Sequence, residues 1–329
     1  MPVNEAPLPK SCLYTAKSVM DFLDYLLPSA EHWQSARRGD LAYRGQASSR
    51  WRLVPKAFRE DQVLGYDRGA QATKPTRVEP QARAEFRGVH QFVRAADDCG
   101  LRITEAGSLL LLQDDPRDVF DDPHWEYRWP QDEILEALAL AQHHGVPTRL
   151  LDFTEDPLTA AFFAASFAWN RAQGRRRTTG QRSYLAVWVI DLRLVRALNL
   201  VRARYPERLG EVRVPRANNA YLGAQSAFFL IDRGSNDMMA RGELPSIDQA
   251  ILDRASYWHT GNRLAGKRIR KTWFDELPVR VVRLRIAHAG ALLRELENRG
   301  VTKGSMMPSL DRVVESLELQ RSILQLGTR

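Results

Sequence analysis

One stretch of the sequence, residues 133–190, limits most strongly what this chain can fold into. Residues 133–143 predict a helix that is apolar almost all round and therefore buried. A glycine and a proline end that helix, and residues 148–153 predict a short extended segment. Thr154 is the predicted N-cap of the Ala- and Phe-rich helix that follows. Residues 185–190, with the sequence LAVWVI, predict the clearest buried strand of the chain.

The rest of the chain adds strands and helices in no regular alternation. Extended segments are expected over residues 41–44, 51–54, 225–231 and 279–286, and helices over residues 18–27, 83–99, 290–299 and 309–323. Because no repeat and no β-α alternation is present, we expect an α+β fold, a single elaborated domain with a central mixed sheet surrounded by helices. Residues 1–17 are predicted to be an N-terminal tail, and residues 18–329 the domain, with a loop-rich insertion at about 60–132.

The charge of the chain is basic and comes mostly from arginine. Lys and Arg together number 48 against 40 acidic residues, which gives a net charge of +8. Forty-one of the basic residues are arginines, whose planar fork suits phosphate better than the lysine ammonium does. This balance favours polyanions or anionic cofactors as partners. The arginines are nevertheless spread over the whole chain, as they would be on a solvated surface or in the product of a GC-rich genome.

Several classes of protein are excluded by what the sequence lacks. No apolar run approaches the 18 or so residues that span a bilayer, and the first residues carry no apolar stretch of signal-peptide length, so a cytoplasmic protein with no membrane partner is expected. Two cysteines are too few for a disulfide framework. The chain has no GxGxxG, GxxxxGK[ST], GxSxG or HExxH motif, which sets aside the common dinucleotide-binding, P-loop, hydrolase and zinc-peptidase classes.

Polar residues are unusually dense between the two apolar helices of the 133–190 stretch. They are Gln142, His143, His144, Thr148, Arg149, Asp152, Thr154, Glu155 and Asp156. Polar groups that enter a core must find partners or each costs about 1 to 3 kcal/mol. One interpretation is structural: Arg149 pairs with Asp152, and Thr154 only caps the helix. The other is a ligand-lined junction, at which the helix N-terminus offers free N–H groups to an anion.

The motifs in and around this region resemble the FRG domain family, which takes its name from an (F/Y)RG motif. The resemblance rests on Tyr43-Arg44-Gly45-Gln46, on WRLVP at 51–55, and on AQHHGVPTRLLDFT at 141–154 with Pro157 and Ala160 to Ala164. Looser similarity continues through NNAYLGAQSAFF at 218–229 and MPSLD at 307–311. The resemblance covers roughly residues 18–317.

The order of these motifs is similar to that of ADP-ribosyltransferases, and this resemblance implies a fold and an NAD site of that kind. It implies that Arg44 holds the NAD pyrophosphate, that Thr154 lies beside the nicotinamide ribose, and that Gln225 occupies the third catalytic position. Since Gln225 cannot ionise, Asp152 or Asp232 is a candidate for the missing carboxylate. The other residues given a role are His143 and His144 as acid, base or orienting donor, and Tyr43, Gly45, Gln46, Gln142, Thr148 and Arg149 as NAD-binding residues.

Three functions follow from these interpretations. The first is an NAD-dependent ADP-ribosyltransferase-like enzyme, bacterial in origin, that acts on a macromolecule as a toxin or a phage-defence effector. The second is a non-catalytic module for nucleic acid or protein, in which the polar cluster is structural and Arg44 pairs with Asp152. The third is a metal-dependent hydrolase that uses His143, His144 and Asp152, although adjacent side chains diverge and no metal site is expected.

Overall fold

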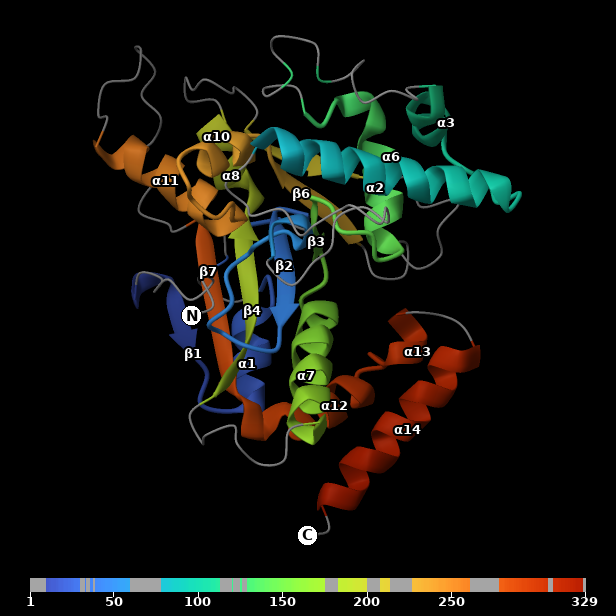
Figure 1. The fold of residues 1–329 in the computed structure, drawn as a ribbon. Coiled ribbons are helices and arrows are strands. Elements are labelled where there is room, and N and C mark those ends of the chain that lie inside the picture. Colours follow the sequence, from blue (N-terminus) through green and yellow to red (C-terminus); the bar gives the residue numbers. More distant parts are fainter. Residues whose placement is uncertain are drawn as a thin grey trace.

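A seven-stranded mixed sheet forms the centre of the fold, and helices cover both of its faces (Figure 1). The strand order is β1-β7-β4-β2-β3-β6-β5, in which only the β1–β7 pair is parallel. The strands are β1 (Leu13–Thr15), β2 (Leu41–Gln46), β3 (Leu151–Thr154), β4 (Tyr184–Asp191), β5 (Leu209–Val212), β6 (Ala227–Asp232) and β7 (Val279–Arg285). The α+β class and the mixed sheet that the sequence predicts are confirmed.

The computed structural model describes residues 10–29, 33, 36–37, 39–59, 78–112, 120, 125, 129–174, 183–199, 208–213, 227–260, 278–306 and 310–327. The helices in these ranges are α1 (Val19–Leu26), α2 (Val78–Asp98), α3 (Glu105–Leu112), α6 (Leu135–His143), α7 (Pro157–Gly174), α8 (Leu192–Asn199), α10 (Ser235–Ala240), α11 (Ile247–Thr260), α12 (Ala289–Asn298), α13 (Lys303–Met306) and α14 (Leu310–Gly327). In this part of the chain, no helix combines the length and the apolar character needed to cross a membrane.

The position of strand β4 between two cores explains why its sequence is apolar without alternation. Leu185, Val187 and Val189 face one core, formed with α1, α7 and α12. Their neighbours Trp188 and Ile190 face a second core, formed with α8 and α11. A strand with both faces covered has no polar side, so a continuous apolar run is expected there. A third core, built mainly from α2, α3 and α6, lies against β5 and β6.

Helix α7 packs unusually close to the sheet at β2. A Cβ atom built at Gly45 would lie 2.0 Å from the Ala160 carbonyl oxygen and 2.6 Å from the Ala164 nitrogen. Only a residue without a side chain can occupy this crossing. The alanines of α7 complete the contact, because Ala160, Ala161 and Ala164 are fully buried and hold the helix axis near the strand. This approach brings the first turns of α7 beside the polar end of β3.

Two predicted regions differ from the structure at their boundaries. Residues 13–15, placed by the sequence in a tail, form β1 and pair in parallel with residues 281–283 of β7, and Tyr14 stacks on Tyr25 of α1 at a ring-centroid distance of 3.8 Å. In the region predicted as a loop-rich insertion, α2 confirms the helix expected over residues 83–99, whereas α3 was not predicted; both pack with α6 around an apolar core.

The extended segment predicted at residues 51–54 is not a strand, which corrects that prediction. Asp248 at the start of α11 supplies the reason. Its carboxylate accepts a hydrogen bond from the Leu53 backbone N–H at 2.9 Å and pairs with the Arg52 guanidinium. A side chain therefore satisfies the backbone that a neighbouring strand would otherwise have paired.

Candidate functional site

Strands β2 and β3 separate soon after they meet, and Arg44 fills the opening. The two strands share a single registered pair, Tyr43 with Thr154, whereas β2 and β4 share six. Beyond that pair, Arg44 Nη1 donates to the Asp152 carbonyl oxygen at 2.7 Å and lies 2.6 Å from Asp152 Oδ2. The Arg44 guanidinium thus makes the hydrogen bond that a paired strand would otherwise make to the Asp152 carbonyl. It also holds the Asp152 carboxylate beside it.

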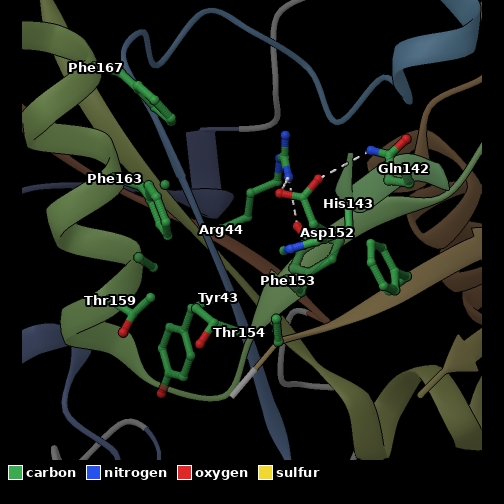
Figure 2. Close-up of a pocket in the computed structure, with 14 residues that line it drawn as sticks. Tyr43, Arg44, Gln142, His143, Asp152, Phe153, Thr154, Thr159, Phe163 and Phe167 are labelled. Atoms are coloured by element: carbon green, nitrogen blue, oxygen red, sulfur yellow. Dashed lines mark hydrogen bonds and ion pairs between the residues drawn. The ribbon is translucent and has the colours of Figure 1, made fainter. Parts of the chain in front are cut away.

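A cavity of about 260 Å³ opens at this point. Figure 2 shows Arg44 and Asp152 on one side of it and the α7 side chains Phe163 and Phe167 on the other. The lining residues come from β2, α6, β3, α7 and β6: Tyr43, Arg44, Gly45, Gln142, His143, Asp152, Phe153, Thr154, Thr159, Ala160, Phe163, Phe167, Ala227 and Phe229. The cavity therefore combines a charged pair with an aromatic wall.

Asp152 presents an ionised carboxylate to this cavity. Its side chain is 55% exposed, while that of Arg44 is 15% exposed. Loss of water around Asp152 opposes ionisation, but the Arg44 charge outweighs this effect and lowers the pKa of the carboxyl below its usual value. Gln142 Nε2 lies 3.5 Å from Asp152 Oδ1, at the limit of hydrogen-bond distance. A negative charge is thus fixed in place at neutral pH.

His143 contributes a neutral imidazole. Burial lowers its pKa, the neighbouring His144 lowers it further, and Asp152 offsets only part of the change. Because the pKa lies below the ordinary value of about 6.5, the ring is uncharged at pH 7 and can accept a proton.

Two buried donors in the cavity lining have no hydrogen-bond partner among the described residues. They are the Tyr43 hydroxyl, on a side chain that is 1% exposed, and Arg44 Nε. Burial, and secondarily the charge of Asp156, raise the pKa of Tyr43, so its phenol stays protonated and is a donor. An unsatisfied buried polar group costs about 1 to 3 kcal/mol, which a polar ligand would relieve.

The N-terminus of α7 is closed to an anion, which corrects two expectations. Asp156, and not Thr154, caps the helix: its carboxylate accepts from the N–H groups of Leu158 at 3.0 Å and Thr159 at 3.1 Å. Pro157 has no N–H to offer. Thr154 Oγ1 instead accepts from the Asp156 N–H at 3.0 Å. The free N–H groups proposed to bind an anion are therefore already occupied.

Arg149 lies away from the cavity, in a separate buried network. Its Nε donates to Glu85 Oε2 at 2.8 Å and its Nη1 donates to Asn236 Oδ1 at 3.1 Å, and the guanidinium is inaccessible to solvent. The structure replaces the expected Arg149–Asp152 pair by two separate pairs, Arg149–Glu85 and Arg44–Asp152. The predicted pairing of Arg44 with Asp152 is confirmed.

Three other predicted residues also lie outside the cavity lining. Thr148 is buried and donates from Oγ1 to Gln142 Oε1 at 2.9 Å, so it orients a lining residue. Gln46 accepts from Trp188 Nε1 at 2.9 Å. His144 stacks on Phe92 of α2 at a centroid distance of 5.8 Å.

The remaining candidates concern the third catalytic position and a metal. Gln225 lies outside the described residues. Asp232 pairs with Arg208 at 2.8 Å and is not a lining residue, so Asp152 is the candidate carboxylate that faces the cavity. Within the described ranges, no three His, Cys, Asp or Glu side chains converge as metal ligands, and the metal-hydrolase interpretation lacks a site there.

The aromatic wall was not predicted. Phe163 and Phe167 follow Thr159 at four-residue intervals on α7, and all three line the cavity. That spacing is the signal the sequence offered, because residues four apart share a helix face. Aromatic residues are more often core than binding surface, so the spacing alone could not separate the two roles.

Comparison with known proteins gives a family match for one segment of the chain, which contains part of the cavity lining. The FRG domain family matches residues 112–172, which include Gln142, His143, Asp152 and Thr154 together with most of α7. Neither the curated proteins nor the solved structures gave a match. Residues 112–172 therefore match an FRG domain, and this segment supplies lining residues on both sides of the cavity, Asp152 on one side and Phe163 and Phe167 on the other.

Proposed function

We propose that this cavity is the active site of an ADP-ribosyltransferase-like enzyme that consumes NAD. The observation that carries the proposal is the Arg44–Asp152 pair, which holds an ionised, half-exposed carboxylate in a cavity with an aromatic wall. In this proposal Asp152 supplies the ionised carboxylate that Gln225, which cannot ionise, does not provide.

The charge of the site suits cleavage of the bond between nicotinamide and ribose. When that bond breaks, the electron pair leaves with neutral nicotinamide and positive charge develops on the ribose carbon. A fixed carboxylate near that carbon stabilises the charge without reorganising, and such preorganised electrostatics is commonly the largest single contribution to catalysis. Arg44 keeps Asp152 ionised and oriented, and is a positioning residue in this scheme.

The size and chemistry of the cavity fit one end of the dinucleotide. Its volume of about 260 Å³ is below the roughly 300 to 1,000 Å³ of sites for drug-sized ligands, so we expect nicotinamide and its ribose inside and the rest of NAD outside. Phe163 and Phe229 offer apolar surface to the ring. The Tyr43 hydroxyl and Arg44 Nε have no hydrogen-bond partner among the described residues, and they offer donors to a carboxamide, hydroxyl or phosphate oxygen.

His143 completes the transfer. As the oxygen or nitrogen of an acceptor adds to the ribose carbon, it loses a proton, and the neutral imidazole can accept it. The products are nicotinamide, an ADP-ribosylated acceptor and one proton, so atoms and charge balance. Water in place of the acceptor would give simple NAD hydrolysis.

The test uses NAD labelled in its adenosine part, with and without bacterial extract. Free nicotinamide and label fixed on macromolecules are measured for the wild type, Asp152→Asn, Arg44→Ala and a control, Asp98→Asn, at an exposed position on α2. Asparagine keeps an oxygen for Arg44, so Asp152→Asn preserves the local geometry. We expect Asp152→Asn to lower nicotinamide release about 100- to 1,000-fold and Asp98→Asn to leave it unchanged.

Binding is measured separately from turnover. NAD should raise the melting temperature of the wild type, and Arg44→Ala should abolish the shift. No shift at millimolar NAD together with no nicotinamide release would overturn the proposal. Release that survives Asp152→Asn would exclude this carboxylate as the source of the stabilising charge.

A further inference from the structure

A ridge of aromatic and basic side chains leads out of the cavity along α7. Phe163, Phe167 and Arg171 follow one another at four-residue intervals and share a helix face. The Phe163 and Phe167 rings stack at a centroid distance of 5.7 Å, and the Arg171 guanidinium lies 4.9 Å from the centroid of the Trp51 ring. These four residues are called the α7 ridge below.

The ridge is partly open to solvent. Phe163 and Phe167 belong to the cavity lining and project from α7 toward the Arg44 side (Figure 2). Phe167 is 52% exposed and Trp51 is 38% exposed, although both are large aromatic residues. Aromatic side chains that begin in a cavity and continue on the surface form a path on which flat groups can stack.

The sequence around the ridge is basic and free of acids. Between Asp156 and Asp191 there is no Asp or Glu, and there are five arginines: Arg171, Arg175, Arg176, Arg177 and Arg182. Of these five arginines, Arg171 belongs to the α7 ridge. Arg50, which precedes Trp51 in the sequence, is exposed. Such a segment attracts a polyanion.

Acidic residues bound the ridge on one side. A neighbouring cavity of about 530 Å³ also touches Phe163 and Phe167, and Glu315 and Glu318 of α14 line it. Glu315 is paired with Lys303, while Glu318 is exposed. A polyanion should therefore follow the ridge toward Arg171 and Trp51 and avoid the α14 side.

We propose that the α7 ridge binds single-stranded nucleic acid, with bases stacked on Phe167 and Trp51 and phosphates near Arg171. Stacking on aromatic side chains combined with arginine contacts is how proteins bind single strands with little sequence preference, at about 1 to 3 kcal/mol per stacked base. A duplex does not fit this mode, because its bases are already stacked on one another. Binding does not require the proposed NAD chemistry. If both hold, the strand is the acceptor, and the nucleotide over Phe167 lies nearest Asp152.

The test measures fluorescence anisotropy of a labelled 12-nucleotide oligo-dT with the full chain, without NAD, between 50 and 300 mM salt. We expect Phe167→Ala and Trp51→Ala each to raise the Kd about tenfold. Arg171→Gln should reduce the slope of log K against log salt by about 0.7. Leu112→Ala and Arg94→Gln, changes at exposed positions on α3 and α2, are the matched controls and should leave the Kd within about twofold.

Several outcomes would overturn the proposal. One is no binding of the oligonucleotide at 50 mM salt, and another is equal loss of affinity in the ridge variants and the controls. Duplex of the same length binding as tightly as the single strand would indicate charge attraction alone. Polyglutamate that competes equally well would indicate a site for acidic polypeptides instead.

Two controls separate binding from folding. Phe167→Trp should retain binding, and unchanged melting temperatures of the variants would exclude misfolding. Because NAD is absent, failure of the proposed enzyme activity would not affect these results.

Discussion

Two arginine–carboxylate pairs lie within a few residues of each other and differ in every property that matters for chemistry. In the Arg149–Glu85 pair the side chains are 0% and 1% exposed. In the Arg44–Asp152 pair they are 15% and 55% exposed. Arg149 and Asp152 are three positions apart in one motif, so the motif alone does not assign their roles.

The partners explain the difference. Arg149 reaches Glu85 with two nitrogens and Asn236 with a third, and its guanidinium lies 5.5 Å from the Phe58 ring centroid, so the network is closed. Arg44 Nε has no partner in the part of the chain that the structure describes, and the Asp152 carboxylate faces a cavity. A closed pair joins elements of the fold, whereas an open pair can meet a substrate. The two pairs therefore differ in free hydrogen-bonding capacity more than in charge, and this difference is why the proposed function rests on Arg44–Asp152.

The largest effect is expected where the closed pair is broken. Arg149→Met leaves Glu85 as an uncompensated buried charge and should lower the free energy of unfolding by about 3 to 5 kcal/mol. Denaturant unfolding followed by far-UV circular dichroism measures it. The double variant Arg149→Met with Glu85→Leu should recover much of this loss. A loss under about 1 kcal/mol in the single variant would remove the distinction between the pairs.

A smaller effect is expected at the cap beside the open pair. Asp156→Ala removes the acceptor of the Leu158 and Thr159 N–H groups and should lower the free energy of unfolding by about 1 kcal/mol. Asp156→Asn should keep most of the stability that Asp156→Ala loses, because asparagine also caps helices. If the site uses its cavity and not the helix terminus, NAD should shift the melting temperature of both variants as it shifts that of the wild type. If NAD no longer shifted the melting temperature of Asp156→Ala but still shifted that of Asp156→Asn, the α7 N-terminus would be part of the NAD-binding site.

The open pair itself should matter little for stability. Since Asp152 is more than half exposed, solvent screening limits the effect of Asp152→Asn on the free energy of unfolding to less than about 1 kcal/mol. The same denaturant measurement is compared with the loss of nicotinamide release. We expect Asp152→Asn to have a large effect on activity and a small effect on the free energy of unfolding. A loss of 3 kcal/mol would instead place Arg44–Asp152 in the same structural class as Arg149–Glu85.

A similarly small effect is a pH dependence of stability from His143. Its folded-state pKa is lowered, so below about pH 6.5 the unfolded chain takes up the proton first and the free energy of unfolding falls. We expect wild type to lose up to about 1 kcal/mol more than His143→Gln between pH 7.5 and 5.5. Equal losses would mean that His143 keeps its ordinary pKa in the folded chain.

The sequence predicted which residues lie together better than it predicted their hydrogen-bond partners. The YRG and LLDFT motifs lie on neighbouring strands, so Tyr43, Arg44, Asp152 and Thr154 do line one cavity. The partner of Arg149 could not be predicted, because Glu85 is 64 residues away on another helix and no local pattern links them. The Asp156 cap was missed and Thr154 was predicted in its place, although Pro157 at the first helical position indicates that the preceding residue is the N-cap.

The close crossing at Gly45 has a consequence for the motif that contains it. The glycine is required by the Ala160 carbonyl, which no side chain could clear, whereas Tyr43 and Arg44 belong to the cavity. A related chain could lose its carboxylate and its entire reaction and still need glycine at this position to let the helix lie on the strand. The glycine of this motif therefore reports close packing of helix on strand, whereas the proposed activity depends on the groups that face the cavity.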